Sequence, residues 1–216
     1  MSTEHHYDVI VVGLGAMGSA ALYQLSKQGA RVLGLDRFSP PHTHGSSHGD
    51  TRLTRLATGE GRHYVPYALR SHEIWRELEE ASSERLLTVT GGLFFSGEVQ
   101  GSPVHGAADF IGETVAAAQA FGIEHEVLDP VEMERRFPQF RYSGVECGYY
   151  EPDAGFVCPE RCIEVQLRLA EAQGALVRTN QTVLEVEPID GGDARVKTAD
   201  GNFTATRVIL STGAWM

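Results

Sequence analysis

The order of hydrophobic runs along the chain predicts an α/β fold that opens with a strand, a helix and a second strand. Residues 7–12 form a continuous β-branched run that stops at a glycine, which is typical of a parallel strand buried on both faces. Apolar residues recur at helical spacing over 16–28, Gly29 marks the helix end, and residues 31–35 return to strand character. The pattern therefore predicts a βαβ unit.

The middle of the chain does not continue this alternation. Residues 38–50 are rich in Pro, His, Gly and Ser, which predicts a long irregular segment of the kind that carries function. A helix is expected over about 63–81, and the elements after it form no further βαβ unit, so we expect a second, inserted α+β domain. These elements are a strand over 86–96, a helix near 107–121, a short helix opening at Pro130 and an extended segment over 144–157.

The last part of the chain resembles the first in its pattern. A helix is predicted from Pro159 to a stop at Gly174, followed by a strand over 175–179. Further β runs follow, separated by Gly191-Gly192 and Asp200-Gly201 as hairpin turns separate strands, and the last run is another buried strand. These runs cover residues 182–189, 194–199, 202–206 and 207–211.

The charge balance and the cysteines narrow the class of protein. The chain has 29 acidic and 18 basic residues and a formal net charge of −11, which argues against nucleic acid and against an anionic membrane surface as partners. Three cysteines in 216 residues cannot form a disulfide framework; they are interpreted as ordinary buried thiols in a reducing compartment. The first eight residues carry no Lys or Arg, which indicates no signal sequence, so we expect a cytoplasmic protein.

A glycine motif lies where the first strand meets the first helix. In Gly13-Leu14-Gly15-Ala16-Met17-Gly18, the first glycine permits a tight turn, the second lets the backbone approach a pyrophosphate, and the third lets helix pack on strand. Asp36 ends the second strand, where a carboxylate can accept hydrogen bonds from a ribose. This combination predicts dinucleotide binding and disfavours NADP, but it leaves nicotinamide and flavin both open.

Two arginines follow the irregular segment at a spacing of three. If this stretch is helical, Arg52 and Arg55 lie on one side, where one can face an anionic flavin and the other can bind a substrate carboxylate. The alternative is a pair of solvated surface arginines. His42, His44 and His48 could suggest a metal, but without nearby cysteines or helical pairing we expect none.

Several of these stretches together resemble the monomeric sarcosine oxidase and N-methyltryptophan oxidase family, within the D-amino-acid-oxidase-like flavoproteins. They are the glycine motif, the segment from His44 to Arg52, Gly59-Glu60-Gly61, Tyr64-Val65-Pro66 and Gly213-Ala214-Trp215. The resemblance implies FAD and a Rossmann-like FAD-binding domain of glutathione-reductase type with an inserted α+β substrate domain. It also implies oxidation of a secondary amine in an N-methyl amino acid, with dioxygen reduced to hydrogen peroxide, by an enzyme that is monomeric in its full-length form.

The resemblance also assigns roles to individual residues and boundaries to the domains. The FAD-binding domain comprises residues 1–85 and 158–216, and residues 86–157 form part of the substrate domain. His48 and Arg52 are expected to face the isoalloxazine, and Arg55 to bind the substrate carboxylate. The expected cofactor-binding residues are Gly13, Gly15, Ala16, Met17, Gly18, Asp36, Ser46, Thr51, Arg52, Val183, Gly213 and Trp215.

The chain departs from the family pattern in two ways. It reads Arg55-Leu56-Ala57-Thr58 where the family commonly has Arg-His-Ala-Tyr, so a short hydroxyl replaces an aromatic ring near the pocket mouth. Family members are also longer, so the sequence corresponds to their N-terminal half and lacks the flavin-attaching cysteine and the oxygen-activating lysine. We expect this half alone to be inactive. The alternatives are an NAD-dependent dehydrogenase and a catalytically silent truncated nucleotide-binding chain; flavin absorbance near ~450 nm excludes the nicotinamide alternative.

Overall fold

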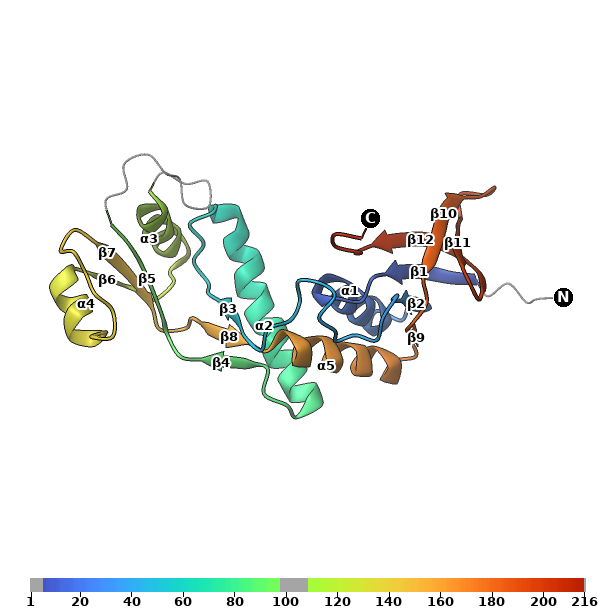
Figure 1. Cartoon of the computed structure of the whole chain (residues 1–216), viewed down its shortest axis with the longest axis horizontal. Coiled ribbons are helices and arrows are strands. Elements are labelled where there is room, and N and C mark those ends of the chain that lie inside the picture. Colours follow the sequence, from blue (N-terminus) through green and yellow to red (C-terminus); the bar gives the residue numbers. More distant parts are fainter. Residues whose placement is uncertain (1–5, 98–108, 216) are drawn as a thin grey trace. The chain divides into compact units, whose positions relative to one another are not determined.

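The computed structural model describes residues 6–97 and 109–215 and divides the chain into two compact units. The first unit contains residues 1–51 and 158–216, and the second contains residues 52–157. The two units are divided at 51/52 and 157/158. Residues 52–85 supply a strand and a long helix to the second unit (Figure 1). The expected limits of the FAD-binding and substrate domains, at 85/86 and 157/158, stay a prediction.

The first unit is built on a six-stranded sheet whose central strands are parallel. Its order is β10-β11-β12-β1-β2-β9, and β1 pairs in parallel with both β12 and β2. The mixed α/β fold with a parallel sheet predicted from the hydrophobic runs is confirmed. The strands are β1 (His6–Val12), β2 (Val32–Leu35), β9 (Leu176–Arg178), β10 (Val183–Pro188), β11 (Ala194–Thr198) and β12 (Gly201–Leu210).

Two helices cover one face of this sheet, α1 (Ala16–Lys27) and α5 (Pro159–Ala172), and they lie side by side (Figure 1). The Ser19 hydroxyl donates to Gln166 Oε1 at 2.8 Å between them, 147 residues apart in sequence. Both side chains are buried, so this hydrogen bond satisfies polar atoms that would otherwise be costly in the core. The contact joins the two chain segments that make up the unit.

The carboxyl-terminal strands differ from the prediction in one respect. Residues 202–206 and 207–211 were expected as separate runs, but β12 is continuous over Gly201–Leu210. Its first half pairs antiparallel with β11, and from Thr204 onward it also pairs in parallel with β1. Pairing with β11 on one edge and with β1 on the other keeps these residues in one continuous strand. Val196 and Phe203 join Ile10 and Leu33 in the same buried cluster.

The second unit contains two three-stranded sheets, β3-β8-β4 and β5-β7-β6. The expected strand over 86–96 is divided between them, because Thr90 and Gly91 turn the chain and both donate their amides to Ala154 O at 3.1 and 2.9 Å. Gly91 has φ +73°, which glycine adopts readily. The strands are β3 (Arg52–Thr54), β4 (Leu87–Val89), β5 (Gly92–Ser96), β6 (Glu126–Leu128), β7 (Cys147–Glu151) and β8 (Gly155–Val157).

The helices of the second unit begin at recognisable signals. Asp109 accepts from Gly112 N at 2.8 Å to cap α3, and Asp129 accepts from Glu132 N at 2.8 Å to cap α4. The expected helix start at Ala107 lies outside the described residues. These helices are the 3-10 turn η1 (Arg62–Tyr64), α2 (Val65–Ser82), α3 (Phe110–Phe121) and α4 (Pro130–Arg136).

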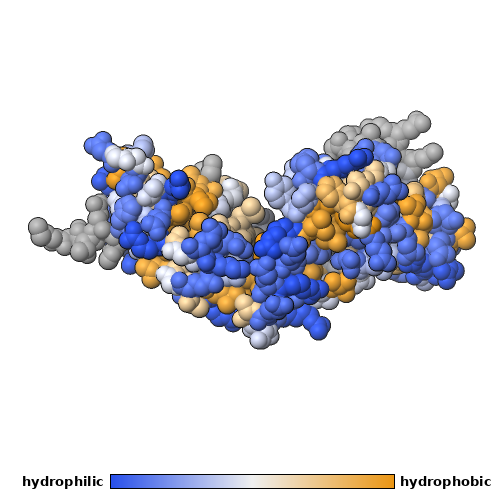
Figure 2. Space-filling view, turned by 180° about the vertical axis from the view of Figure 1, so that it is seen from behind, coloured by the Kyte–Doolittle hydropathy of each residue, from blue (hydrophilic) through white to orange (hydrophobic). Residues whose placement is uncertain are grey.

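Apolar side chains also reach the surface of each unit (Figure 2). Within residues 6–97 and 109–215, every helix is too short or too polar to cross a membrane.

Candidate cofactor and substrate sites

The turn between β1 and α1 is closed by glycines that leave no room for side chains. Gly13 adopts φ +88°, and a Cβ added there would lie 2.6 Å from Ser211 O, directly after the adjacent strand β12. A Cβ on Gly18 would lie 1.7 Å from Gly13 O, so this glycine lets α1 pack against the turn. Gly15 differs, because its nearest neighbour would be Ser47 Oγ at 3.5 Å. Gly15 therefore has room for a Cβ in ordinary contact, and it lines the pocket at the N-terminus of α1, where backbone amides and the helix dipole favour an anion.

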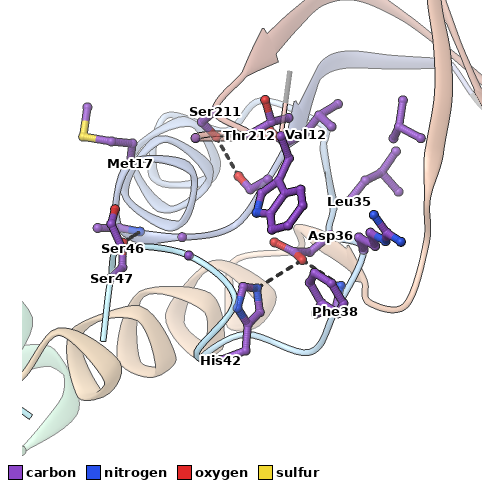
Figure 3. A pocket seen from close by; sticks show the side chains of 18 of the residues that line it. Val12, Met17, Leu35, Asp36, Phe38, His42, Ser46, Ser47, Ser211 and Thr212 are labelled. Atoms are coloured by element: carbon purple, nitrogen blue, oxygen red, sulfur yellow. Dashed lines mark hydrogen bonds and ion pairs between the residues drawn. The ribbon is translucent and has the colours of Figure 1, made fainter. Parts of the chain in front are cut away.

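Asp36 follows β2 and is buried beside this turn. Its Oδ2 accepts from Leu14 N at 2.7 Å, and its Oδ1 accepts from Phe38 N at 2.8 Å. His42 Nε2 lies 3.4 Å from Oδ1, and Figure 3 shows the ring pointing toward the carboxylate. These contacts orient the carboxylate at the pocket wall, where a ribose hydroxyl can still reach its remaining lone pairs.

The segment from His44 to Asp50 is held over the turn at three points. Ser47 Oγ accepts from Ala16 N at 3.2 Å, and the Trp215 indole donates to His44 O at 3.0 Å. Glu160, in the first turn of α5, accepts from Gly49 N at 2.6 Å. Partial burial opposes the ionisation of Glu160, yet its own backbone amide and those of the loop hold its pKa below the ordinary value. The anionic form therefore pins the loop.

Together these elements enclose a pocket of about 260 Å³ in the first unit. Gln181 Oε1 and Thr212 Oγ1 are buried polar atoms of residues that line it, and neither has a hydrogen-bond partner among the residues that the structure describes. Buried polar groups are normally paired, so these two indicate a polar ligand. The donors at the helix start, the oriented carboxylate and the unpaired atoms fit the adenosine diphosphate portion of FAD.

Most residues expected to bind the cofactor line this pocket. Met17 does so while its side chain points away (Figure 3), so only its backbone faces a ligand there. Gly18 packs against Gly13, and His48 and Thr51 are not among the lining residues. Trp215 is 62% exposed. The expected residues that line the pocket are Gly13, Gly15, Ala16, Met17, Asp36, Ser46, Val183, Gly213 and Trp215.

The pocket also contains residues that the sequence did not single out for cofactor binding. Each lies near an assigned residue, and that proximity is the signal that could have found it. Among them are Phe38 and His42 after Asp36, Ser47 after Ser46, Gln181 before Val183, and Thr212 before Gly213.

The helical arrangement considered for Arg52 and Arg55 is wrong, because Arg52–Thr54 forms strand β3. Arg55 follows the strand directly and lies outside any helix, so helical spacing does not bring the two guanidinium groups to one side. Arg52 is exposed, and Arg55 lines an open hollow in the second unit. Its other lining residues are Leu53, Thr54, Thr58, Glu60 and Tyr64.

Arg55 is held on several sides in this hollow, and its side chain is 17% exposed. Its Nε donates to Ala57 O at 3.1 Å, and its Nη2 lies 2.6 Å from both oxygens of Glu60. The guanidinium also lies 5.0 and 5.5 Å from the ring centroids of Phe94 and Phe110. A guanidinium so placed binds carboxylates, and Glu60 is such a group from the chain itself. Arg55 is therefore not the solvated surface arginine that the alternative interpretation predicted.

The interpretation of all three cysteines as buried thiols is wrong for two of them. Cys162 is buried, but Cys147 is exposed and Cys158 is intermediate, and none of them forms a disulfide. Among residues 6–97 and 109–215, there is no group of three or more His, Cys, Asp or Glu residues arranged to hold a metal ion.

A sheet with parallel central strands, a glycine turn at a helix start and an acidic residue after the second strand define a dinucleotide-binding domain. Residues 8–216 match the DAO family, described as FAD dependent oxidoreductase, and the chain belongs to this family. The cofactor implied by the resemblance is thereby confirmed as FAD.

Characterised relatives agree with the resemblance. The chain is 44% identical to monomeric sarcosine oxidase of Bacillus sp. (strain B-0618), covering 100% of this chain and 53% of the relative. It is 34% identical to N-methyl-L-tryptophan oxidase of Escherichia coli (strain SMS-3-5 / SECEC), covering 97% and 54%. The open form of NikD, described as an unusual amino acid oxidase essential for nikkomycin biosynthesis, is similar with a TM-score of 0.83 and 31% identity, covering 98% and 52%. The chain thus spans about half the length of these proteins.

Proposed function

We propose that this chain belongs to an enzyme that oxidises the secondary amine of an N-methyl amino acid, of sarcosine or N-methyltryptophan type, and reduces dioxygen to hydrogen peroxide. The observation that carries the proposal is the pocket beside the glycine turn. There Leu14 N orients the Asp36 carboxylate, and Gln181 Oε1 and Thr212 Oγ1 have no hydrogen-bond partner among the described residues. The names of the relatives support the substrate class. The 216 residues alone are proposed to have no turnover.

The cofactor is proposed to lie with its pyrophosphate at the start of α1 and its ribose at Asp36. Bound there, the flavin supplies the two-electron acceptor for amine oxidation. Ser46, Thr51 and Arg52 are proposed to line its ring system, with His48 facing the isoalloxazine. The chain's own task is to fix the flavin and to bind the amino acid in an orientation that allows reaction.

Arg55 is proposed to bind the substrate carboxylate. Its Nη2 contacts both oxygens of Glu60, so a substrate carboxylate takes the place of the Glu60 carboxylate. The contacts of Arg55 with Ala57 O and Phe94 do not involve Glu60, and they keep the guanidinium in place during this exchange.

The proposed setting is the cytoplasm, supported by three free cysteines. The proposed partners are an amino acid and dioxygen, without nucleic acid or membrane, and the full-length form is proposed to be a monomer. The net charge of −11 supports the exclusion of nucleic acid.

The test compares Arg55→Ala with Arg70→Ala in the flavin-loaded full-length enzyme, because Arg70 lies in a surface ion pair on α2. We expect both variants to retain flavin and only Arg55→Ala to lose acetate affinity, by about 2–4 kcal/mol or roughly 30- to 700-fold. Flavin absorbance titration measures the affinity, and a peroxide assay with sarcosine and N-methyltryptophan measures turnover. Unchanged acetate affinity, or a purified protein without flavin, would contradict the proposal.

A further inference from the structure

A buried carboxylate lies behind Arg55 and takes no part in the function proposed above. Glu151 ends β7, pairs with Gly92 of β5, and is fully buried. A carboxylate in such a position is costly unless several donors satisfy it. The identity of those donors therefore indicates what the group does.

Three donors reach Glu151, and two of them come from the chain directly after Arg55. Leu56 N donates to Oε1 at 2.6 Å, and Ala57 N donates to Oε2 at 3.0 Å. The Tyr149 hydroxyl donates to Oε2 at 2.7 Å, and burial followed by this hydrogen bond raises the pKa of Tyr149 above its ordinary value. Both oxygens act only as acceptors.

Ala57 connects the buried carboxylate to the guanidinium. Its amide donates to Glu151, and its carbonyl accepts from Arg55 Nε at 3.1 Å. Leu56 and Ala57 are both buried, and they share one apolar cluster with Phe94, against which the guanidinium lies. The direction of the Arg55 side chain is therefore set by a backbone that Glu151 holds from 95 residues away.

We propose that Glu151 is a positioning residue for carboxylate binding by Arg55. It fixes the peptide groups of Leu56 and Ala57 so that Ala57 O meets Arg55 Nε and the outer edge of the guanidinium faces the hollow. This inference rests on the proposed function of Arg55. A positioning role differs from a role in stability alone, because it predicts that Glu151 substitutions weaken the binding only of ligands that carry a carboxylate.

The test uses Glu151→Gln in the flavin-loaded full-length enzyme, with Tyr149→Phe as the matched control. Glutamine keeps one acceptor oxygen and turns an NH₂ group toward a backbone amide, whereas Tyr149→Phe leaves both amide contacts in place. We expect Glu151→Gln to weaken acetate binding about tenfold or more, which corresponds to about 1.4 kcal/mol, and Tyr149→Phe to change it less than about twofold. Both variants should retain FAD.

Kinetics give the second measurement. With Glu151→Gln we expect a raised KM for N-methyl amino acids and little change in kcat, while N-methylethylamine, which has no carboxylate, reacts as with the unsubstituted protein. Two results with Glu151→Gln would overturn the assignment of Glu151 but leave that of Arg55 intact. One is an equal loss of activity with both substrates, and the other is an unchanged acetate affinity while Arg55→Ala weakens acetate binding. Normal acetate affinity in Arg55→Ala would overturn both this inference and the proposed function. If Glu151→Gln does not fold, Glu151→Asp serves in its place, because it keeps the charge but shortens the side chain and so draws the carboxylate away from the two amides. It should show the same selective loss, and equal loss for both substrates would again overturn the assignment.

Discussion

Gly15 and Gly18 belong to the same turn, yet the structure predicts opposite consequences for their replacement by alanine. A Cβ at Gly18 would lie 1.7 Å from Gly13 O and 2.6 Å from Ser211 Oγ, so the backbone must move to accept it. A Cβ at Gly15 would meet Ser47 Oγ at 3.5 Å, which is ordinary van der Waals contact. Gly18→Ala therefore damages the fold, whereas Gly15→Ala narrows only the space proposed for the pyrophosphate.

The difference in stability between the two variants can be worked out from the usual free-energy costs of such substitutions. Overpacking costs about 1–3 kcal/mol, and a conflict with backbone atoms, which cannot rotate away, places Gly18→Ala near the upper value. A glycine replaced at a tolerated conformation changes the free energy of unfolding by less than about 1 kcal/mol. At about 2–4 °C per kcal/mol for a chain of this length, Gly18→Ala should lower the melting temperature by about 6–12 °C. Gly15→Ala should leave it nearly unchanged.

Thermal unfolding followed by circular dichroism without flavin measures the first effect, and flavin content after purification measures the second. We expect both variants to lose flavin, and only Gly18→Ala to lose stability. A Gly18→Ala variant that melts with the unsubstituted protein would refute the packing argument. Stoichiometric flavin in Gly15→Ala would refute the proposed pyrophosphate position.

Three further predictions concern acidic side chains. Asp36→Ala should reduce stability as well as flavin affinity, by about 1–3 kcal/mol for each of the two backbone amides that lose an acceptor, and denaturant unfolding without flavin measures this loss. Glu160→Gln should weaken FAD binding while Glu164→Gln does not, because only Glu160 holds the loop amides; fluorescence titration compares the two Kd values. Hydrogen bonds from Ser143 lower the pKa of Glu146 to about 2. The contribution of Glu146 to the stability of the fold should therefore be present above about pH 4.5 and disappear as the pH falls toward 2. A carboxyl NMR titration that gives an ordinary pKa for Glu146 would contradict this.

The sequence alone determined the elements whose signals are local. The run ending at Gly13, the helical spacing after it and Asp36 at the end of the next strand predicted the βαβ unit, and the structure has β1, α1 and β2 there. Helix starts and ends could be predicted for the same reason, as with Pro159 at the start of α5. In each case neighbouring residues in the chain carry the physical cause, so the pattern is readable without the fold.

Only the tertiary structure decided which distant residues meet. Arg55 was selected by its spacing from Arg52 in an assumed helix, but strand pairing between β3 and β8 makes that stretch extended. Its contacts with Phe94 and the hold of Glu151 on Ala57 join segments separated by 39 and 94 positions. Glu160 likewise reaches Gly49 across 111 positions. Such contacts depend on which strands and helices pack together, and that choice is made by burial summed over the whole unit, which no local pattern records.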